Sequence, residues 1–280
     1  MRNVCFLLGF QVLMVATCLP LSATTLPKVP QSPHQFSLGV ESFYYTYREP
    51  GLMRDKGFLY GANATYNYTF AQDFFLQPDV RFAYGRTNYK SNGTGSSKNT
   101  PNWLVEPRLV FGKRFNLTSI TELDPYVGVG YRYKTDNHDG KRTTTGHLGY
   151  RRKSHYLYVP LGFTLRQQIN CEWSLAPTVE FDWFLRGWQQ SYLPGQIGKT
   201  KAVNNTQKKG YGLKGDLMLT KKFTKSSLSV GPFINYWNIK DSDPVKVKFV
   251  DGNGNIVGTG GVFEPHNKTI EVGLKVNYSF

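Results

Sequence analysis

The last twelve residues of the chain alternate strictly between two kinds of side chain. Apolar and aromatic residues occupy every second position from Ile270 to Phe280, and polar, charged or glycine residues fill the positions between them. Because successive side chains of a strand point to opposite faces, this pattern predicts a β-strand with one apolar and one polar face. No convincing 3.6-residue period of helical length competes with it, so the fold class is all-β.

The same alternation recurs along the chain and predicts about ten strands. Short links between them alternate with long polar links, which is typical of an up-and-down antiparallel meander. The strand segments are 36–47, 58–70, 74–85, 103–115, 125–134, 157–166, 173–186, 211–220, 228–237 and 269–280. A further alternation, Val245–Val247–Phe249 before a Gly/Asn-rich stretch, predicts an additional hairpin in the last long loop.

Two features favour a membrane barrel over a soluble β-sandwich, which also alternates. The strands run to roughly ten to fourteen residues, whereas sandwich strands average about five to six. Aromatic residues end the apolar face of several strands, as Trp173 and Trp183 do, and aromatics gather at membrane interfaces. An open sheet in lipid would leave its edge amides unsatisfied. We therefore predict a closed up-and-down antiparallel transmembrane β-barrel.

The N-terminus has the order of a secretory signal peptide: Arg2, an apolar stretch over 4–19, then small residues. We predict a signal peptide at 1–23, a short periplasmic segment at 24–34 and the barrel with its long outward loops at 35–280. A buried N-terminal helix and a lipoprotein signal acylating Cys18 are the alternatives.

The net charge of +15 first suggests a nucleic-acid partner. An exported protein rarely meets its own nucleic acids, so we predict none. Cleavage of the signal peptide would leave Cys171 as the one cysteine, and a single thiol forms no internal disulfide. The fold itself must therefore stabilise the mature chain.

With these strands in place, the chain resembles the bacterial outer-membrane β-barrel proteins. Its last strand, with alternate apolar positions ending in Tyr278 and Phe280, resembles the signal that the barrel-assembly machinery of that family reads. The resemblance implies localisation in the bacterial outer membrane and assembly by that machinery. It also implies that the short turns face the periplasm and the long loops face outward.

The polar face of the predicted strands carries charges of both signs. A barrel of about ten strands is narrow, and unpaired charges inside it would be costly, so we predict a crosslinked ionic network that plugs the lumen. A narrow path for ions or small solutes is the alternative. The residues are Glu41, Asp79, Arg81, Glu106, Arg108, Arg132, Glu180, Asp182, Arg186, Lys214, Asp216, Glu271 and Lys275.

Two long links, near 135–153 and 193–209, carry much of the excess positive charge. Such a basic rim would lie where lipopolysaccharide phosphates are, and Lys and Arg bind phosphate through charge-assisted hydrogen bonds. Ordinary solvated loops are the alternative, and a host or surface ligand stays open. The basic residues are Lys141, Arg142, Arg151, Arg152, Lys153, Lys199, Lys201, Lys208 and Lys209.

The best candidate for catalysis is the run Asp136–Asn137–His138–Asp139, with His147, His155 and His266 elsewhere in long loops or near them. The chain resembles omptin proteases in strand number but lacks a matching paired-acid motif. We therefore interpret the run as a solvated loop and predict no catalysis, no cofactor and no metal. The predicted role is envelope structure or surface interaction. The alternatives are a narrow porin-like channel and, less favoured, an omptin- or lipase-like hydrolase.

Overall fold

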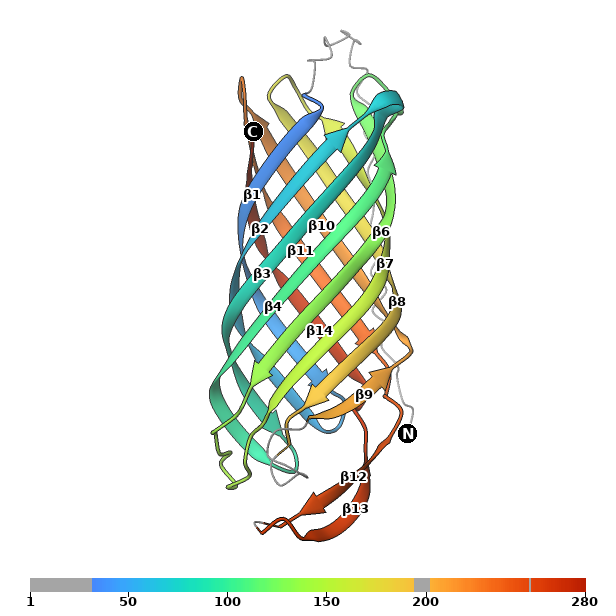
Figure 1. Cartoon of the computed structure of the whole chain (residues 1–280). Helices are drawn as coiled ribbons and strands as arrows, with labels where there is room; N and C mark the ends of the chain where they lie inside the picture. Colours follow the sequence, from blue (N-terminus) through green and yellow to red (C-terminus); the bar gives the residue numbers. More distant parts are fainter. Residues whose placement is uncertain (1–31, 194–201, 252) are drawn as a thin grey trace, which may run out of the picture.

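Ten strands of the chain close into one antiparallel up-and-down barrel, as the sequence predicts (Figure 1). The structure is a computed structural model that describes residues 32–193, 202–251 and 253–280. The barrel strands are β1 (His34–Glu49), β2 (Met53–Thr69), β3 (Phe74–Ser91), β4 (Gly95–Lys113), β6 (Thr121–Asn137), β7 (Arg151–Gln168), β8 (Trp173–Ser191), β10 (Gly210–Lys222), β11 (Ser227–Ile239) and β14 (Asn267–Ser279).

The barrel closes between its first and last strands. β14 pairs with β11 on one side and with β1 on the other, with Val40 opposite Val276. The terminal Phe280 exchanges two backbone hydrogen bonds with Phe36, at 3.0 and 2.9 Å. This closure leaves neither β1 nor β14 as a free edge, which a sheet surrounded by lipid requires.

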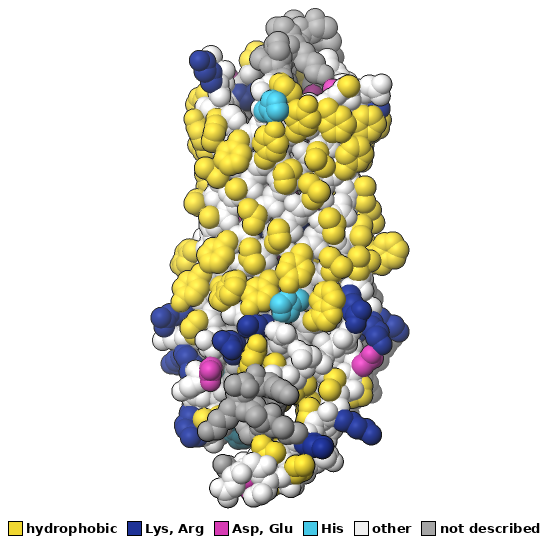
Figure 2. Space-filling view, in the orientation of Figure 1, with side chains coloured by type: hydrophobic (Ala, Val, Ile, Leu, Met, Phe, Trp, Pro, Cys, Tyr) yellow, Lys and Arg dark blue, Asp and Glu magenta, His cyan; other side chains and the backbone are white. Residues whose placement is uncertain are grey.

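The outer face of the barrel is an apolar belt. Outward residues such as Val272 and Leu274 are 51% and 58% exposed. Figure 2 shows this belt, with most of the Lys and Arg side chains of that face gathered beside it at the end that carries the long loops. Within 32–193, 202–251 and 253–280, no helix has the length and apolarity to cross a membrane.

The long-loop end contains more regular structure than the sequence predicts, because several strands continue past the apolar belt. The predicted hairpin is confirmed as β12 (Val245–Val250) and β13 (Ile256–Val262), which stand beyond the barrel (Figure 1). β9 (Val203–Gln207), in the predicted second basic loop, pairs with the end of β8. Two short elements, η1 (Ala71–Asp73) and β5 (Phe115–Asn116), lie at the tight-turn end.

The lumen is filled by aromatic as well as charged side chains, and the aromatic share was not predicted. One buried cluster is Phe43, Tyr45, Tyr47, Leu59, Ala83, Leu104 and Phe233, and a second is Tyr156, Tyr158, Phe184, Trp237 and Ile239. Gly61 of β2 makes room for a neighbouring charge, because a Cβ there would lie 2.8 Å from Glu41 Oε1. The hydrophobic core of this protein is therefore inside the barrel.

Arg186 is a correction to the predicted lumen charges. A register shift between β7 and β8 pairs Leu157 with Arg186 but Tyr158 with Phe184. Phe184 keeps the inward phase of Asp182, and the bulge that follows it leaves Arg186 exposed, with its guanidinium 5.5 Å from the Trp188 ring centroid. A strict period of two predicts Arg186 inside the barrel, but the extra residue of the bulge breaks that period.

Several predictions lie outside the described residues. They are the signal peptide at 1–23, most of the segment at 24–34, and the basic residues Lys199 and Lys201.

Because the apolar belt faces lipid, a charge introduced within it should destabilise the protein more than a charge introduced outside it. Val272→Arg places a cation near the middle of β14 on the lipid face and should lower the free energy of unfolding by about 2–4 kcal/mol. The matched variant Val257→Arg, in the β13 hairpin where the side chain is 65% exposed, should change it little. Urea unfolding in lipid vesicles measures both. Equal costs at the two positions would contradict a lipid-facing belt.

Candidate functional site

A continuous network of ion pairs crosses the lumen. Arg81 on β3 donates from Nε to Glu41 on β1 at 2.6 Å and from Nη1 to Glu271 on β14 at 2.8 Å. Arg132 on β6 also binds Glu271, through Nη2, and donates to Glu106 on β4 at 2.9 Å. Two arginines thus share one carboxylate that is fully buried.

The network continues through Lys214 on β10. Its Nζ lies 2.9 Å from Glu106, 3.1 Å from Glu180 and 3.2 Å from Asp182. Glu180 in turn accepts from Arg108, which also binds Asp79 at 2.9 Å. Every charged group of this network lies within ion-pair distance of an opposite charge, as buried ions require.

Except for Arg186, the predicted lumen charges all point into the barrel and take part in ion pairs. Lys275 and Asp216 form a separate pair at 3.0 Å, in a more open position. The sequence prediction missed the neutral members: Tyr158 donates to Glu106 at 2.6 Å, Tyr126 to Glu180 at 2.7 Å, and Asn235 to Glu271 at 2.9 Å. All three residues lie at inward-facing positions of their strands, and that position in the alternation could have identified them.

Arg152 is a second correction, because it is not part of a basic surface. β7 begins at Arg151, so strand alternation turns the side chain of Arg152 into the barrel, where it is 6% exposed. It donates to Glu49 at 2.5 Å and to Asp136 at 2.8 Å. A residue assigned to a loop is thus a buried ion-pair centre at the outer end of the lumen.

Glu264, which follows β13, lies near Arg152 at the outer end of the lumen. It accepts a hydrogen bond from Tyr47 at 3.1 Å and lies 3.7 Å from Arg152. Burial raises the pKa of Glu264 to about 7. The Arg152 charge opposes that rise and the neighbouring Glu49 charge adds to it.

Asp136 and His138 are not a solvated loop, which corrects the interpretation of that run. Both are buried, and donor atoms of Asp136, His138 and Asp55 lie within 4.8 Å of one another. Asp55 comes from β2, far away in sequence. Asn102 on β4 donates to Asp55 at 3.2 Å. Only Asp139, the last residue of the run, is exposed.

The other histidines lie apart from this cluster. His155 is on the outer face, with Nδ1 2.5 Å from the Tyr131 hydroxyl. His147 is exposed beside Thr145, and His266 hydrogen-bonds Asn238 at 2.6 Å. The structure therefore brings one of the candidate histidines, His138, together with carboxylates in the described outer lumen.

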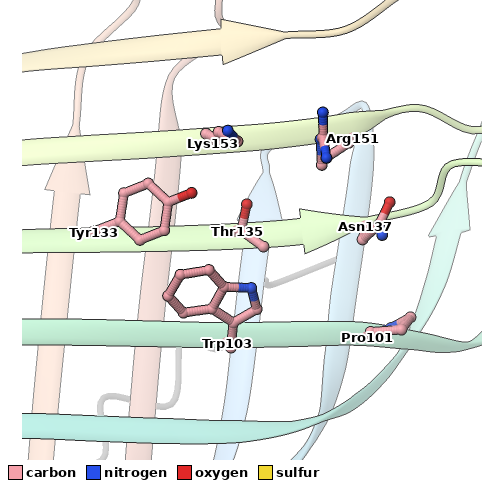
Figure 3. A pocket seen from close by; sticks show the side chains of 7 residues that line it. All are labelled: Pro101, Trp103, Tyr133, Thr135, Asn137, Arg151 and Lys153. Carbon is pink, nitrogen blue, oxygen red and sulfur yellow. The ribbon is translucent and has the colours of Figure 1, made fainter.

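A cationic and aromatic pocket of about 290 Å³ lies on the outer surface of β4, β6 and β7 (Figure 3). Trp103 and Tyr133 line it together with Arg151 and Lys153. Both cations also lie over the Tyr192 ring, at 4.4 and 5.4 Å from its centroid. The Nε atom of Arg151 is buried and has no hydrogen-bond partner among the described residues.

The remaining predicted basic residues lie around the long-loop end. Lys141 donates to the carbonyls of Lys98 and Asn99, and Arg142 is exposed. Both line a surface hollow of about 420 Å³, together with Ser96, Ser97, Lys98, Thr143 and Thr144. Lys208 pairs with Asp243, and Lys209 is exposed.

No protein-family model and no curated protein sequence matches the chain. Among solved structures, the outer membrane protease OmpT from Escherichia coli has 11% sequence identity and a TM-score of 0.61, covering 92% of this chain and 100% of that one. The translocator domain of the autotransporter NalP from Neisseria meningitidis has 10% identity and a TM-score of 0.44, with 88% of each chain covered. At such identities, the likeness to OmpT shows a shared fold, that of a bacterial outer-membrane barrel.

The lumen network predicts unequal costs for removing two of its charges. Glu271→Gln leaves Arg81 and Arg132 without their shared carboxylate and should lower the free energy of unfolding by about 3–5 kcal/mol. Asp216→Asn breaks the more open pair with Lys275 and should cost about 1 kcal/mol or less. Urea titration in vesicles measures both variants. If Glu271→Gln costs no more than Asp216→Asn, the network is not a buried ionic structure.

Glu264 predicts a pH dependence of stability. Folded Glu264 holds its proton to about pH 7, whereas the ordinary pKa is 4.5. The unfolded chain therefore loses that proton first, and stability falls as the pH rises from about 4.5 to 7. Glu264→Gln should remove this loss and stabilise the protein at pH 8, relative to wild type, by up to about 3 kcal/mol.

Unfolding at pH 5 and pH 8 tests this, with the exposed Glu172→Gln as control. The control should follow wild type at both values. The account of Glu264 fails if Glu264→Gln also follows wild type.

Proposed function

We propose that this outer-membrane β-barrel protein is a non-catalytic surface protein of the envelope that binds lipopolysaccharide around its outer rim. The observation that supports it best is the pocket formed by Trp103, Tyr133, Arg151 and Lys153. It lies on the outside of the barrel and combines aromatic rings with cations. Lipopolysaccharide has both of the matching parts, acyl chains and phosphates.

The chemistry of the pocket fits each part. Aromatic rings favour the boundary between hydrocarbon and head groups, which is where Trp103 and Tyr133 would lie. Arg151 and Lys153 hold cations next to these rings, and the Arg151 Nε atom lacks a partner within the described chain. Phosphate oxygens accept strong charge-assisted hydrogen bonds from such groups. Other outward cations at the same end, such as Arg142, would extend the anionic contact.

The lumen favours a plug over a channel. Large side chains that are fully buried inside it include Trp237, Arg132, Tyr45 and Tyr158. They come from different strands and are tied to the ion-pair network or to the aromatic clusters. A porin-like role would require this network to open, so a channel is the second candidate.

A hydrolase is a further candidate because of one observation, the cluster of Asp55, Asp136 and His138 near the outer end of a fold shared with OmpT, a protease. The geometry does not favour it. Arg152 occupies both oxygens of Asp136, at 2.8–3.3 Å, and His138 is buried. Arg152 therefore holds the Asp136 carboxylate, and the His138 Nε2 atom is buried facing Asp55, not a substrate.

Lipid binding is tested with the double variant Arg151→Ala/Lys153→Ala. Each cation near an anionic surface contributes about 1 kcal/mol, so affinity for lipopolysaccharide should fall about 30-fold. The matched control is Lys246→Ala/Lys248→Ala, which removes two exposed cations from the β12–β13 hairpin. Competition with fluorescent lipopolysaccharide in nanodiscs measures both.

The control should bind like wild type. Dephosphorylated lipid A should bind wild type as weakly as intact lipid A binds the double variant. Equal binding by the double variant and wild type would overturn the proposal.

A further inference from the structure

We infer that Asp55, Asp136 and His138 form a binding site for a divalent metal ion of the zinc class at the outer end of the lumen, with Asn102 beside it. The site joins Asp55 on β2 and Asp136 on β6 with His138, which comes immediately after β6. Local sequence patterns do not reveal this site, because Asp55 is remote from the Asp136–His138 run.

The first support is a set of buried polar atoms that lack partners. Asp55 Oδ1, His138 Nε2 and Asn102 Oδ1 have no hydrogen bond within the described chain. The three residues are 1%, 7% and 1% exposed. Buried polar groups without partners are rare and costly, and an unseen ion is one of the ordinary explanations for them. Here the three residues lie together: Asp55 is 3.2 Å from the Asn102 amide and 3.8 Å from the His138 ring.

The second support is the way that neighbours orient these side chains. His138 Nδ1 lies 3.3 Å from the Thr100 hydroxyl and 3.5 Å from that of Ser97, which leaves Nε2 toward Asp55 Oδ2, 3.8 Å away. A metal-binding histidine usually has its second ring nitrogen held in this way. Asn102 Nδ2 donates to Thr87 at 2.7 Å and to Asp55 at 3.2 Å, and so helps to orient the Asp55 carboxylate.

The third support is charge. Asp55 and Asp136 share the outer lumen with Glu49, whereas the buried cations beside these three carboxylates are Arg152 and Lys134. A divalent cation would offset the excess of negative charge. The competing explanation is a direct contact between His138 and Asp55 without a metal.

The donor set selects the class of ion. Zinc and its neighbours accept imidazole nitrogen with carboxylate oxygen at about 2.0–2.2 Å, whereas calcium and magnesium prefer oxygen ligands alone. Small side-chain rotations would bring donors now within 4.8 Å around one ion. Access is from outside, because Ser97 lines the 420 Å³ surface hollow and also lies beside His138. Such an ion would link β2 to β6.

The test is titration of Co²⁺ into the purified, folded full chain after removal of metal with EDTA. We expect visible absorption that saturates at one Co²⁺ per chain and is displaced by Zn²⁺ but not by Mg²⁺. Asp55→Asn and His138→Gln should each weaken Co²⁺ binding at least about 10-fold. Asp139→Asn and His147→Ala alter exposed neighbours of the same types and should bind like wild type.

Heat-modifiable migration in detergent gels confirms that each variant is folded. Asn102→Asp adds a carboxylate and should tighten Co²⁺ binding, whereas the metal-free contact predicts no such gain. No saturable Co²⁺ site, or equal binding by wild type, Asp55→Asn and His138→Gln, would overturn the inference. Displacement by Mg²⁺ as readily as by Zn²⁺ would overturn the assignment to the zinc class.

Discussion

The constraint on which this structure depends is that backbone groups in lipid find no water to bond. A strand sheet in that solvent must close on itself, and here the bonds between Phe36 and Phe280 complete the ring. Closure with ten strands then fixes a narrow interior. Everything that faces inward has to be packed or paired with something else that faces inward, which is why the core of this protein is the lumen.

That interior explains the composition of the chain. Averaged over all residues, the negative mean hydropathy and the high aromatic content look like a compromise. These averages combine two sets of residues at alternate positions, one facing lipid and one facing the lumen. The charges inside occur as pairs and bridges, such as the two arginines on Glu271. The excess positive charge lies outside, toward the end with the long loops, where an anionic surface would meet it.

Much of the fold could be predicted because the period of two is repeated in every barrel strand and closure follows from solvent physics. The site was less predictable. Arg186 was misplaced by a bulge, and Arg152 by a strand that continues past the membrane belt. Asp55 could not be identified as a neighbour of His138, since two strands, β3 and β4, separate β2 from β6 in the sheet. Pairing across a barrel depends on register and shear, which local patterns do not encode.

The central claim is that the buried network closes the lumen, and planar-bilayer conductance of the purified, folded protein tests it most directly. The account predicts a quiet membrane for wild type. The variant Glu271→Gln removes the carboxylate that Arg81 and Arg132 share, and it should show more frequent openings than wild type. Stepwise openings of the wild-type protein, at a frequency that scales with the amount inserted, would contradict the account.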